Sequence, residues 1–130
     1  MTKKTHLCVG IALTLPIIYT FFNPISLLGI LGSIAPDWDL KLGIKHRTIT
    51  HSLLALIIST SIIYIFSSSI AIVFALNYLL HLILDSLTKM GVPFLYPFKN
   101  RYYGLKLIRT GGTEDLCICA IAIAFITLII

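Results

Sequence analysis

Residues 48–84 read TITHSLLALIISTSIIYIFSSSIAIVFALNYLLHLIL, and this stretch decides the fold. Apart from His51 and His81 it contains no acid or base. A membrane-spanning helix needs about 20 consecutive apolar residues, so the stretch is long enough for two. The triplet Ser67-Ser68-Ser69 supplies the turn between them. The sequence therefore predicts paired membrane helices near 50–66 and 70–87.

The chain on either side continues the same pattern of apolar runs and turns. The N-terminal run breaks at Phe22-Asn23-Pro24, because Asn-Pro favours a turn and proline disfavours helix in the residue before it. This predicts a helix near 5–22 and a shorter one near 25–35. The last run predicts a helix over 116–130. These two short helices reach only about 16 Å and about 22 Å at helical rise, so full crossing stays open for both.

The composition excludes a soluble or a disordered protein. Hydrophobic residues make up 58% of the chain, charged residues only 12%, and the mean hydropathy is +0.99. A typical soluble domain has about 45–50% apolar and about 25% charged residues. A small soluble fold needs polar residues to cover its surface, and this chain has too few. We expect one integral membrane domain over residues 1–130, an all-α polytopic bundle of about four to five helices.

The basic residues predict how the bundle is oriented. With a cytoplasmic N-terminus, the Asn23-Pro24 and serine turns lie outside, and the 36–49 and 88–115 loops lie inside. Every basic residue then falls on the cytoplasmic side, as the positive-inside rule requires. These residues are Lys3, Lys4, Lys41, Lys45, Arg47, Lys89, Lys99, Arg101, Lys106 and Arg109. The net charge of +5 is thereby explained by topology, and no nucleic-acid partner is expected.

The same orientation brings all five acids and all four histidines to or near the cytoplasmic face. His81 and Asp85 are four residues apart and share one helix face. Ionisable groups are costly inside a membrane and usually bind something there. The pair therefore predicts a metal site at this face, with a simple His–Asp hydrogen bond as the alternative.

Other candidate ligands lie in the loops at that face. Asp37 and Asp39 project to the same side of an extended segment and can share a cation, or they can mark a helix terminus facing water. His46 and His51 flank the expected helix start, where Thr48 or Thr50 would be the N-cap. Imidazole and carboxylate groups are the donors that zinc and manganese commonly bind.

Several short motifs in a fixed order resemble a known family. They are Thr5-His6, Pro36-Asp37-Trp38-Asp39, His46-Arg47 with His51-Ser52, His81-x-x-x-Asp85, and Gly91-Val92 before Pro97-Phe98. Together, over about residues 5–115, they resemble the YdjM-like membrane-bound metal-dependent hydrolases. The resemblance implies an inner-membrane protein that hydrolyses its substrate with a bound metal.

The family is also distantly similar to zinc-dependent phospholipase C and P1-type nucleases. His81-x-x-x-Asp85 matches the first zinc motif of those enzymes. The second motif is not intact, because Thr110 stands where the histidine before Glu114 would be. The resemblance therefore implies one or two ions, zinc first, rather than three. The ligands it implies are His6, Asp37, Asp39, His46, His51, His81, Asp85 and Glu114.

The expected function is hydrolysis of a phosphoester, in a lipid or a polyprenyl phosphate, at the cytoplasmic surface of the inner membrane. Asp37 or Asp39, where not bound to metal, would act as general base. Arg47 would bind a phosphate oxygen through two donors. Membrane lipid is the expected partner, and a homo-oligomer is possible. Glu114 has an alternative role in the first turn of the last helix, where acids are favoured.

Two other functions remain open at this point. The metal could be a structural staple in a protein that contacts a partner through the basic 88–115 loop. Alternatively, His81 and Asp85 could relay protons or ions across the membrane. A structural metal site is closed by protein ligands, whereas a catalytic site keeps a position for water.

Overall fold

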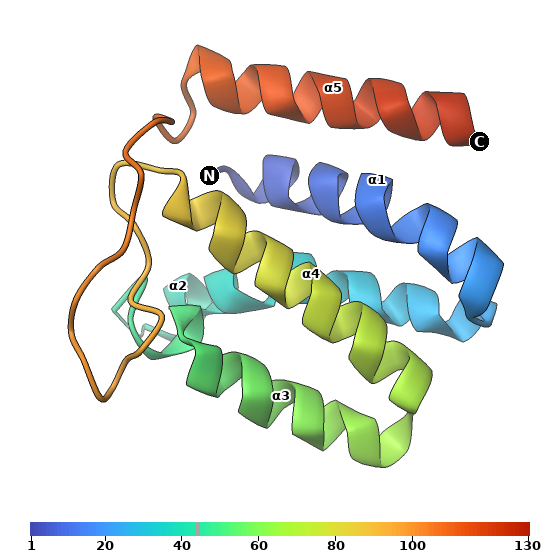
Figure 1. The fold of residues 1–130 in the computed structure, drawn as a ribbon, viewed down its shortest axis with the longest axis horizontal. Coiled ribbons are helices and arrows are strands. Elements are labelled where there is room, and N and C mark those ends of the chain that lie inside the picture. The colour runs from blue at the N-terminus through green and yellow to red at the C-terminus, as the bar shows by residue number, and fades with distance from the viewer. Residues whose placement is uncertain (44) are drawn as a thin grey trace.

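The computed structural model describes residues 1–43 and 45–130 and is helical almost throughout (Figure 1). In chain order the elements are α1 (Lys3–Phe21), the 3-10 helices η1 (Pro24–Ser33) and η2 (Ala35–Trp38), α2 (Asp39–Leu42), η3 (Ile49–His51), α3 (Leu53–Phe66), α4 (Ser68–Ser86) and α5 (Thr113–Ile129). Over the described residues, strand-like pairing is limited to the isolated bridges Thr88–Ile108 and Val92–Tyr103. The all-α prediction is confirmed.

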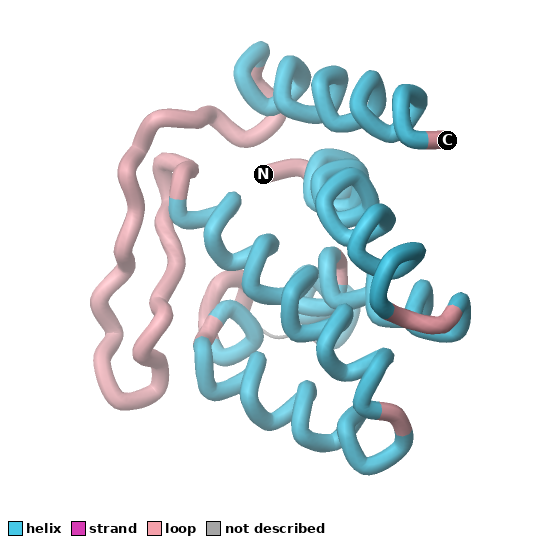
Figure 2. The backbone as a smooth tube through the Cα atoms, turned by 45° about the vertical axis from the view of Figure 1, so that its right-hand side comes forward, coloured by secondary structure: helices cyan, strands magenta, loops and turns pink. Residues whose placement is uncertain are grey.

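The long elements run back and forth between two ends of the bundle, as predicted (Figure 1). We call one end the polar end. It holds the start of α1, the segment of η2, α2 and η3, and the loop from α4 to α5. The other end holds the turn after α1, the turn between α3 and α4, and the C-terminus (Figures 1 and 2). The assignment of the polar end to the cytoplasm stays a prediction.

Serine residues fix both ends of α3 and the start of α4. Ser67 ends α3 by donating its N–H to Ile63 O at 3.0 Å, and its side chain caps α4 by accepting from Ile70 N. The predicted serine turn is confirmed. The predicted start of α3 was wrong, because Ser52 is its N-cap in place of Thr48 or Thr50. His51 therefore lies in the preceding 3-10 turn rather than in the helix.

The predicted helix near 25–35 is the 3-10 helix η1. A 3-10 helix rises about 2.0 Å per residue, so it is longer than an α-helix with the same number of residues. Small residues explain this form. Ser26, Gly29 and Gly32 recur every three residues, the 3-10 period, and all three are buried. A Cβ on Gly29 would lie 2.7 Å from the backbone nitrogen of Phe74 in α4. The backbones of η1 and α4 therefore touch, as in small-residue contacts between membrane helices.

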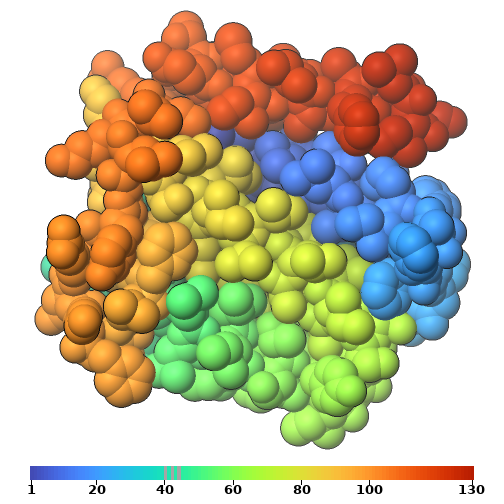
Figure 3. Space-filling model, in the orientation of Figure 1, coloured from blue at the N-terminus to red at the C-terminus, as the bar shows by residue number. Residues whose placement is uncertain are grey.

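The remaining packing is simple. α5 packs along α1, and both lie on the same side of α4 (Figure 1). α1 and α4 are long and apolar enough to cross a membrane, whereas η1 and α3 are shorter apolar helices. No residue of α3 is buried, and Ile57, Ile62 and Ile65 are each more than half exposed. The loop from α4 to α5 covers the polar end, over the ends of α3 and α4 (Figure 3).

The backbone contact between η1 and α4 can be tested at Gly32. We expect Gly32→Ala to lower the free energy of unfolding by about 1–3 kcal/mol, because the new methyl group meets the Phe74 carbonyl and the chains must separate. Thermal unfolding in detergent would measure the change. Leu27→Ala, on an exposed part of the same helix, is the control. Equal melting of the Gly32 variant and wild type would contradict the close approach.

Candidate metal centre

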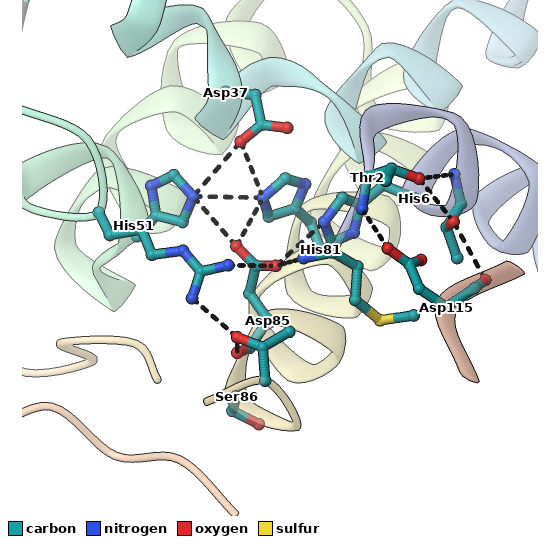
Figure 4. A network of polar contacts seen from close by, with 12 residues as sticks. Thr2, His6, Asp37, His51, His81, Asp85, Ser86 and Asp115 are labelled. Carbon is teal, nitrogen blue, oxygen red and sulfur yellow. Dashed lines mark hydrogen bonds and ion pairs between the residues drawn. The ribbon is translucent and has the colours of Figure 1, made fainter. Parts of the chain in front are cut away.

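Two histidines and two aspartates meet at the polar end (Figure 4). We call them the four-donor group: Asp37 from η2, His51 from η3, and His81 and Asp85 from α4. The Nε2 atoms of the two histidines are 3.3 Å apart. Each Nε2 lies between 3.5 and 3.7 Å from one oxygen of each aspartate. All four side chains are buried.

These spacings fit a metal ion. Donor atoms in a tetrahedral centre with bonds of about 2.0–2.1 Å are about 3.3–3.4 Å apart. The two aspartates lie on opposite sides of the imidazole pair, so the four donors surround a common point (Figure 4). The group could therefore hold one ion.

Both histidines are held so that Nε2 faces this point. His81 Nδ1 donates to the carbonyl oxygen of Ser33 at 2.7 Å. Because a carbonyl can only accept, the neutral ring carries its proton on Nδ1 and leaves Nε2 free as a ligand. His51 Nδ1 faces Asp39 at 3.5 Å and the Thr50 hydroxyl at 3.1 Å. Such outer partners are the usual support of metal-binding histidines.

The two carboxylate oxygens of Asp85 face different partners. Oδ2 faces His51 and His81, whereas Oδ1 lies 3.0 Å from Arg47 Nη2 and 3.1 Å from His6 Nε2. The α-amino group of Met1 also contacts Oδ1. The His6 ring stacks on His81, with centroids 3.7 Å apart. His6 therefore lies beside the group and supports two of its members.

Arg47 has a different role from the predicted one. Its Nη1 donates to Thr88 Oγ1 at 2.8 Å and to Gly91 O at 3.1 Å, and its Nη2 pairs with Asp85. Both terminal nitrogens are thus engaged with the protein, so the two-donor fork expected to bind phosphate is not free. The residue is buried and has a φ of 57°, a left-handed conformation that is rare for a long side chain.

The Gly91-Val92 motif positions a backbone carbonyl that binds Arg47. Gly91 has a φ of 69°, and a Cβ there would lie 2.7 Å from the Tyr103 carbonyl oxygen. Val92 and Tyr103 exchange backbone hydrogen bonds of 2.8 and 2.9 Å, which close the loop against itself. The Gly91 carbonyl is thereby held where it accepts from Arg47.

A second group adjoins the first through His51. It contains Asp39, His46 and His51. Asp39 lies 3.0 Å from His46 Nδ1 and accepts from the Thr50 hydroxyl at 2.8 Å and from the Arg47 backbone N–H at 3.3 Å. The His46 side chain is 29% exposed, unlike any member of the four-donor group. Asp39 and His46 could therefore help to hold an ion, or could transfer protons beside an ion bound by the four-donor group.

The electrostatics of these loops favour added positive charge. Burial would raise the pKa of Asp37, but pairing with His51 and nearby His81 holds that pKa below its ordinary value. Burial would likewise raise the pKa of Asp39, but its contacts with His46 and Thr50 outweigh burial, so this pKa is also lowered. Burial lowers the pKa of His51, yet Asp37 and Asp85 outweigh it and the pKa is raised.

Glu114 is not brought to either group, since its side chain is exposed. The buried acid of α5 is instead Asp115, which accepts from Thr2 N at 3.0 Å and from Gly111 N at 2.8 Å. Gly112 precedes the helix as its N-cap. Asp115 therefore ties α5 to the start of α1. The other seven predicted ligands all lie in or beside the two groups.

The fold and this centre define a helical membrane protein with a buried His/Asp group that could bind metal. The chain belongs to the YdjM inner membrane protein family, which matches residues 1–130. The relative YvsG of Bacillus subtilis (strain 168), described as an uncharacterized protein, is 32% identical over 146 aligned residues, which cover 95% of this chain and 91% of YvsG. No solved structure matches the chain. The family resemblance is confirmed, and the distant similarity to phospholipase C stays a prediction.

Metal binding by the four-donor group predicts the metal content of variants. We expect a divalent ion to copurify with the wild type and to be mostly lost from His81→Ala and Asp85→Ala, because each change removes a donor atom. Elemental analysis of the purified protein would measure this. Glu114→Gln, a change of an exposed acid outside both groups, should leave the content unchanged. Full retention in both ligand variants would refute the centre.

Metal binding should also depend on pH. The ion and a proton compete for His51, whose pKa lies above the ordinary value of 6.5, so affinity should rise with pH until that pKa is passed. Below it we expect about a tenfold loss of affinity per pH unit, because the ring must shed one proton to bind. Equilibrium dialysis at a series of pH values would measure the affinity. A flat profile across the titration of His51 would contradict its role as a ligand.

Proposed function

We propose that the protein is a membrane-bound, zinc-dependent hydrolase that cleaves a phosphoester of a membrane lipid at the cytoplasmic surface of the inner membrane. One observation carries the proposal. Three donor residues, His51, His81 and Asp85, are each held in place by a protein group that contacts the second nitrogen or oxygen of the side chain. The fourth, Asp37, lies on the separate short helix η2. Catalytic zinc centres commonly use three protein ligands of this kind and keep the fourth position for water.

Zinc suits the donors, since imidazole nitrogen and carboxylate oxygen in a tetrahedral arrangement are typical of it. When bound, zinc would polarise a phosphoryl oxygen and lower the pKa of a water. The residues of the chain supply the remaining parts. Arg47 and His6 are positioning residues, because both hold Asp85 Oδ1 and leave Oδ2 toward the histidines.

Asp37 is the proposed general base. Its lowered pKa keeps it ionised at neutral pH, and it lies within 3.7 Å of both Nε2 atoms that would hold the ion. A water there would be within its hydrogen-bonding reach, as a general base requires. His46, oriented by Asp39 and partly exposed, is the proposed acid that gives a proton to the leaving group.

The surface of the polar end supports a substrate with an anionic head. Every basic residue except Arg47 is exposed, and all lie at the polar end. Lysine and arginine near a membrane surface attract anionic lipids with about 1 kcal/mol for each residue. A phosphate at headgroup depth would therefore be concentrated next to the two groups.

A second candidate is a structural metal staple in a protein that acts by binding a partner. The burial of all four donors favours it, because a closed set of four protein ligands is characteristic of structural zinc. The two functions differ in what Asp37 does. In the staple Asp37 is a ligand, and in the hydrolase it is a base beside three ligands.

Asp37→Asn separates the two. For a hydrolase we expect zinc content and folding near wild type and turnover lowered about 10²–10⁴-fold, the usual contribution of a general base. For a staple we expect zinc and thermal stability to fall together. Elemental analysis, unfolding and hydrolysis of phospholipids and polyprenyl phosphates in detergent give the three readouts, with Glu114→Gln as the control. Loss of zinc from Asp37→Asn would overturn the proposed base.

A further inference from the structure

An apolar groove of about 640 Å³ lies between η1, α3 and α4. Its walls include Leu28 and Leu31 from η1, Ile58 and Ile62 from α3, and Phe74 from α4. Neither the predicted motifs nor the proposed hydrolysis accounts for it. The groove is built where α3 stands away from η1, while both helices pack on α4.

The hydroxyl groups in the lining that lie on α3 and α4 are already hydrogen-bonded within the protein. The Ser59 hydroxyl in the wall already donates to the Ala55 carbonyl at 2.7 Å within its own helix. The Tyr78 hydroxyl donates to the Thr50 carbonyl. The other lining side chains carry hydrocarbon toward the space, apart from the indole of Trp38. An occupant that fits this lining is itself hydrocarbon.

One end of the groove adjoins the candidate metal centre. Trp38, a lining residue, lies between the two aspartates of the Pro36-Asp37-Trp38-Asp39 motif. Ile49, also in the lining, lies two residues before His51 in η3. Tyr78 lies almost one helical turn before His81 on α4. A chain that lies in the groove would therefore have its end at the four-donor group.

The shape of the groove suits a single lipid chain. From Leu54 to Ile62, both in the lining, α3 rises about 12 Å. A helix with side chains is about 10–12 Å across, whereas a single extended hydrocarbon chain is much narrower.

We propose that the groove binds one hydrocarbon chain of an anionic, phosphate-bearing bilayer lipid and places its headgroup at the polar end. The exposed lysines and arginines of that end complement the charge of the headgroup. The lining residues Ile58 and Ile62 of α3 are each about half exposed, so the groove opens to the outside and a chain can enter from the bilayer. The presentation of the head to the four-donor group rests on the proposed hydrolysis, but binding of the chain does not.

Trp38 is the only tryptophan of the chain and lines the groove, so its fluorescence reports the occupant. The probe is phosphatidic acid with brominated acyl chains, added to the zinc-loaded protein in detergent. We expect saturable quenching, and weaker quenching by brominated phosphatidylcholine, which has no net charge.

The variant Ile58→Phe with Ile62→Phe fills the groove, whereas Ile57→Phe with Ile65→Phe places the same bulk on α3 outside the lining. Loss of contact with one buried methylene weakens binding about fourfold, so the filled variant should need at least about fourfold more phosphatidic acid for half-maximal quenching. The control should match wild type. Circular dichroism and zinc content would show that both variants fold.

Three results would overturn the proposal. The first is quenching of wild type that rises linearly without saturation, and the second is equal quenching of filled and control variants. The third is a wild-type dimer that becomes monomeric only in the filled variant, which would make a second copy of the chain the occupant. Saturable quenching that persists in Asp37→Asn, together with an absence of hydrolysis in wild type, would refute the hydrolase and leave the lipid groove standing.

Discussion

The buried carboxylate of Asp85 is the constraint on which the rest of this structure depends. An ionised group deep in a helical bundle is tolerated only when charged and hydrogen-bonding partners surround it. Here Arg47 and His6 meet one oxygen, and His51 and His81 meet the other. Those partners come from α1, from the segment before α3, and from α4 itself. Satisfying one charge therefore brings three distant parts of the chain to a single point at the polar end.

The packing of η1 supplies the second half of the centre. Because Ser26, Gly29 and Gly32 let η1 touch the backbone of α4, the carbonyl of Ser33 reaches His81 Nδ1 at 2.7 Å. The chain then turns into η2, which carries Asp37 to the far side of the imidazole pair (Figure 4). A stripe of small residues in an apolar helix thus decides both which nitrogen of His81 is free and where the second carboxylate lies.

Much of this was predictable, and the failures have physical causes. Hydropathy locates the helices, because the bilayer sets their length, and the i, i+4 spacing places His81 and Asp85 on one face. Positive-inside counting gathers the histidines and acids at one end, but it cannot tell which side chains point inward. Hence Glu114 was expected at the metal and is exposed, while Asp115 beside it is buried. Arg47 was expected to face substrate, since nothing local in the sequence reveals its partner Asp85.

Charge balance explains how this centre could hold a cation. Three buried carboxylates, Asp37, Asp39 and Asp85, face one guanidinium and one ammonium, so the group carries excess negative charge while its histidines are neutral. The raised pKa of His51 expresses this imbalance, because a proton on that ring is one way to correct it. A divalent cation corrects it too, and Nε2 of His51 can serve only one of them at a time. Either a proton or a metal ion can therefore compensate the same excess negative charge. The lowered pKa values of Asp37 and Asp39 keep that excess charge in place at neutral pH, with Asp37 ionised beside the position that the cation would take.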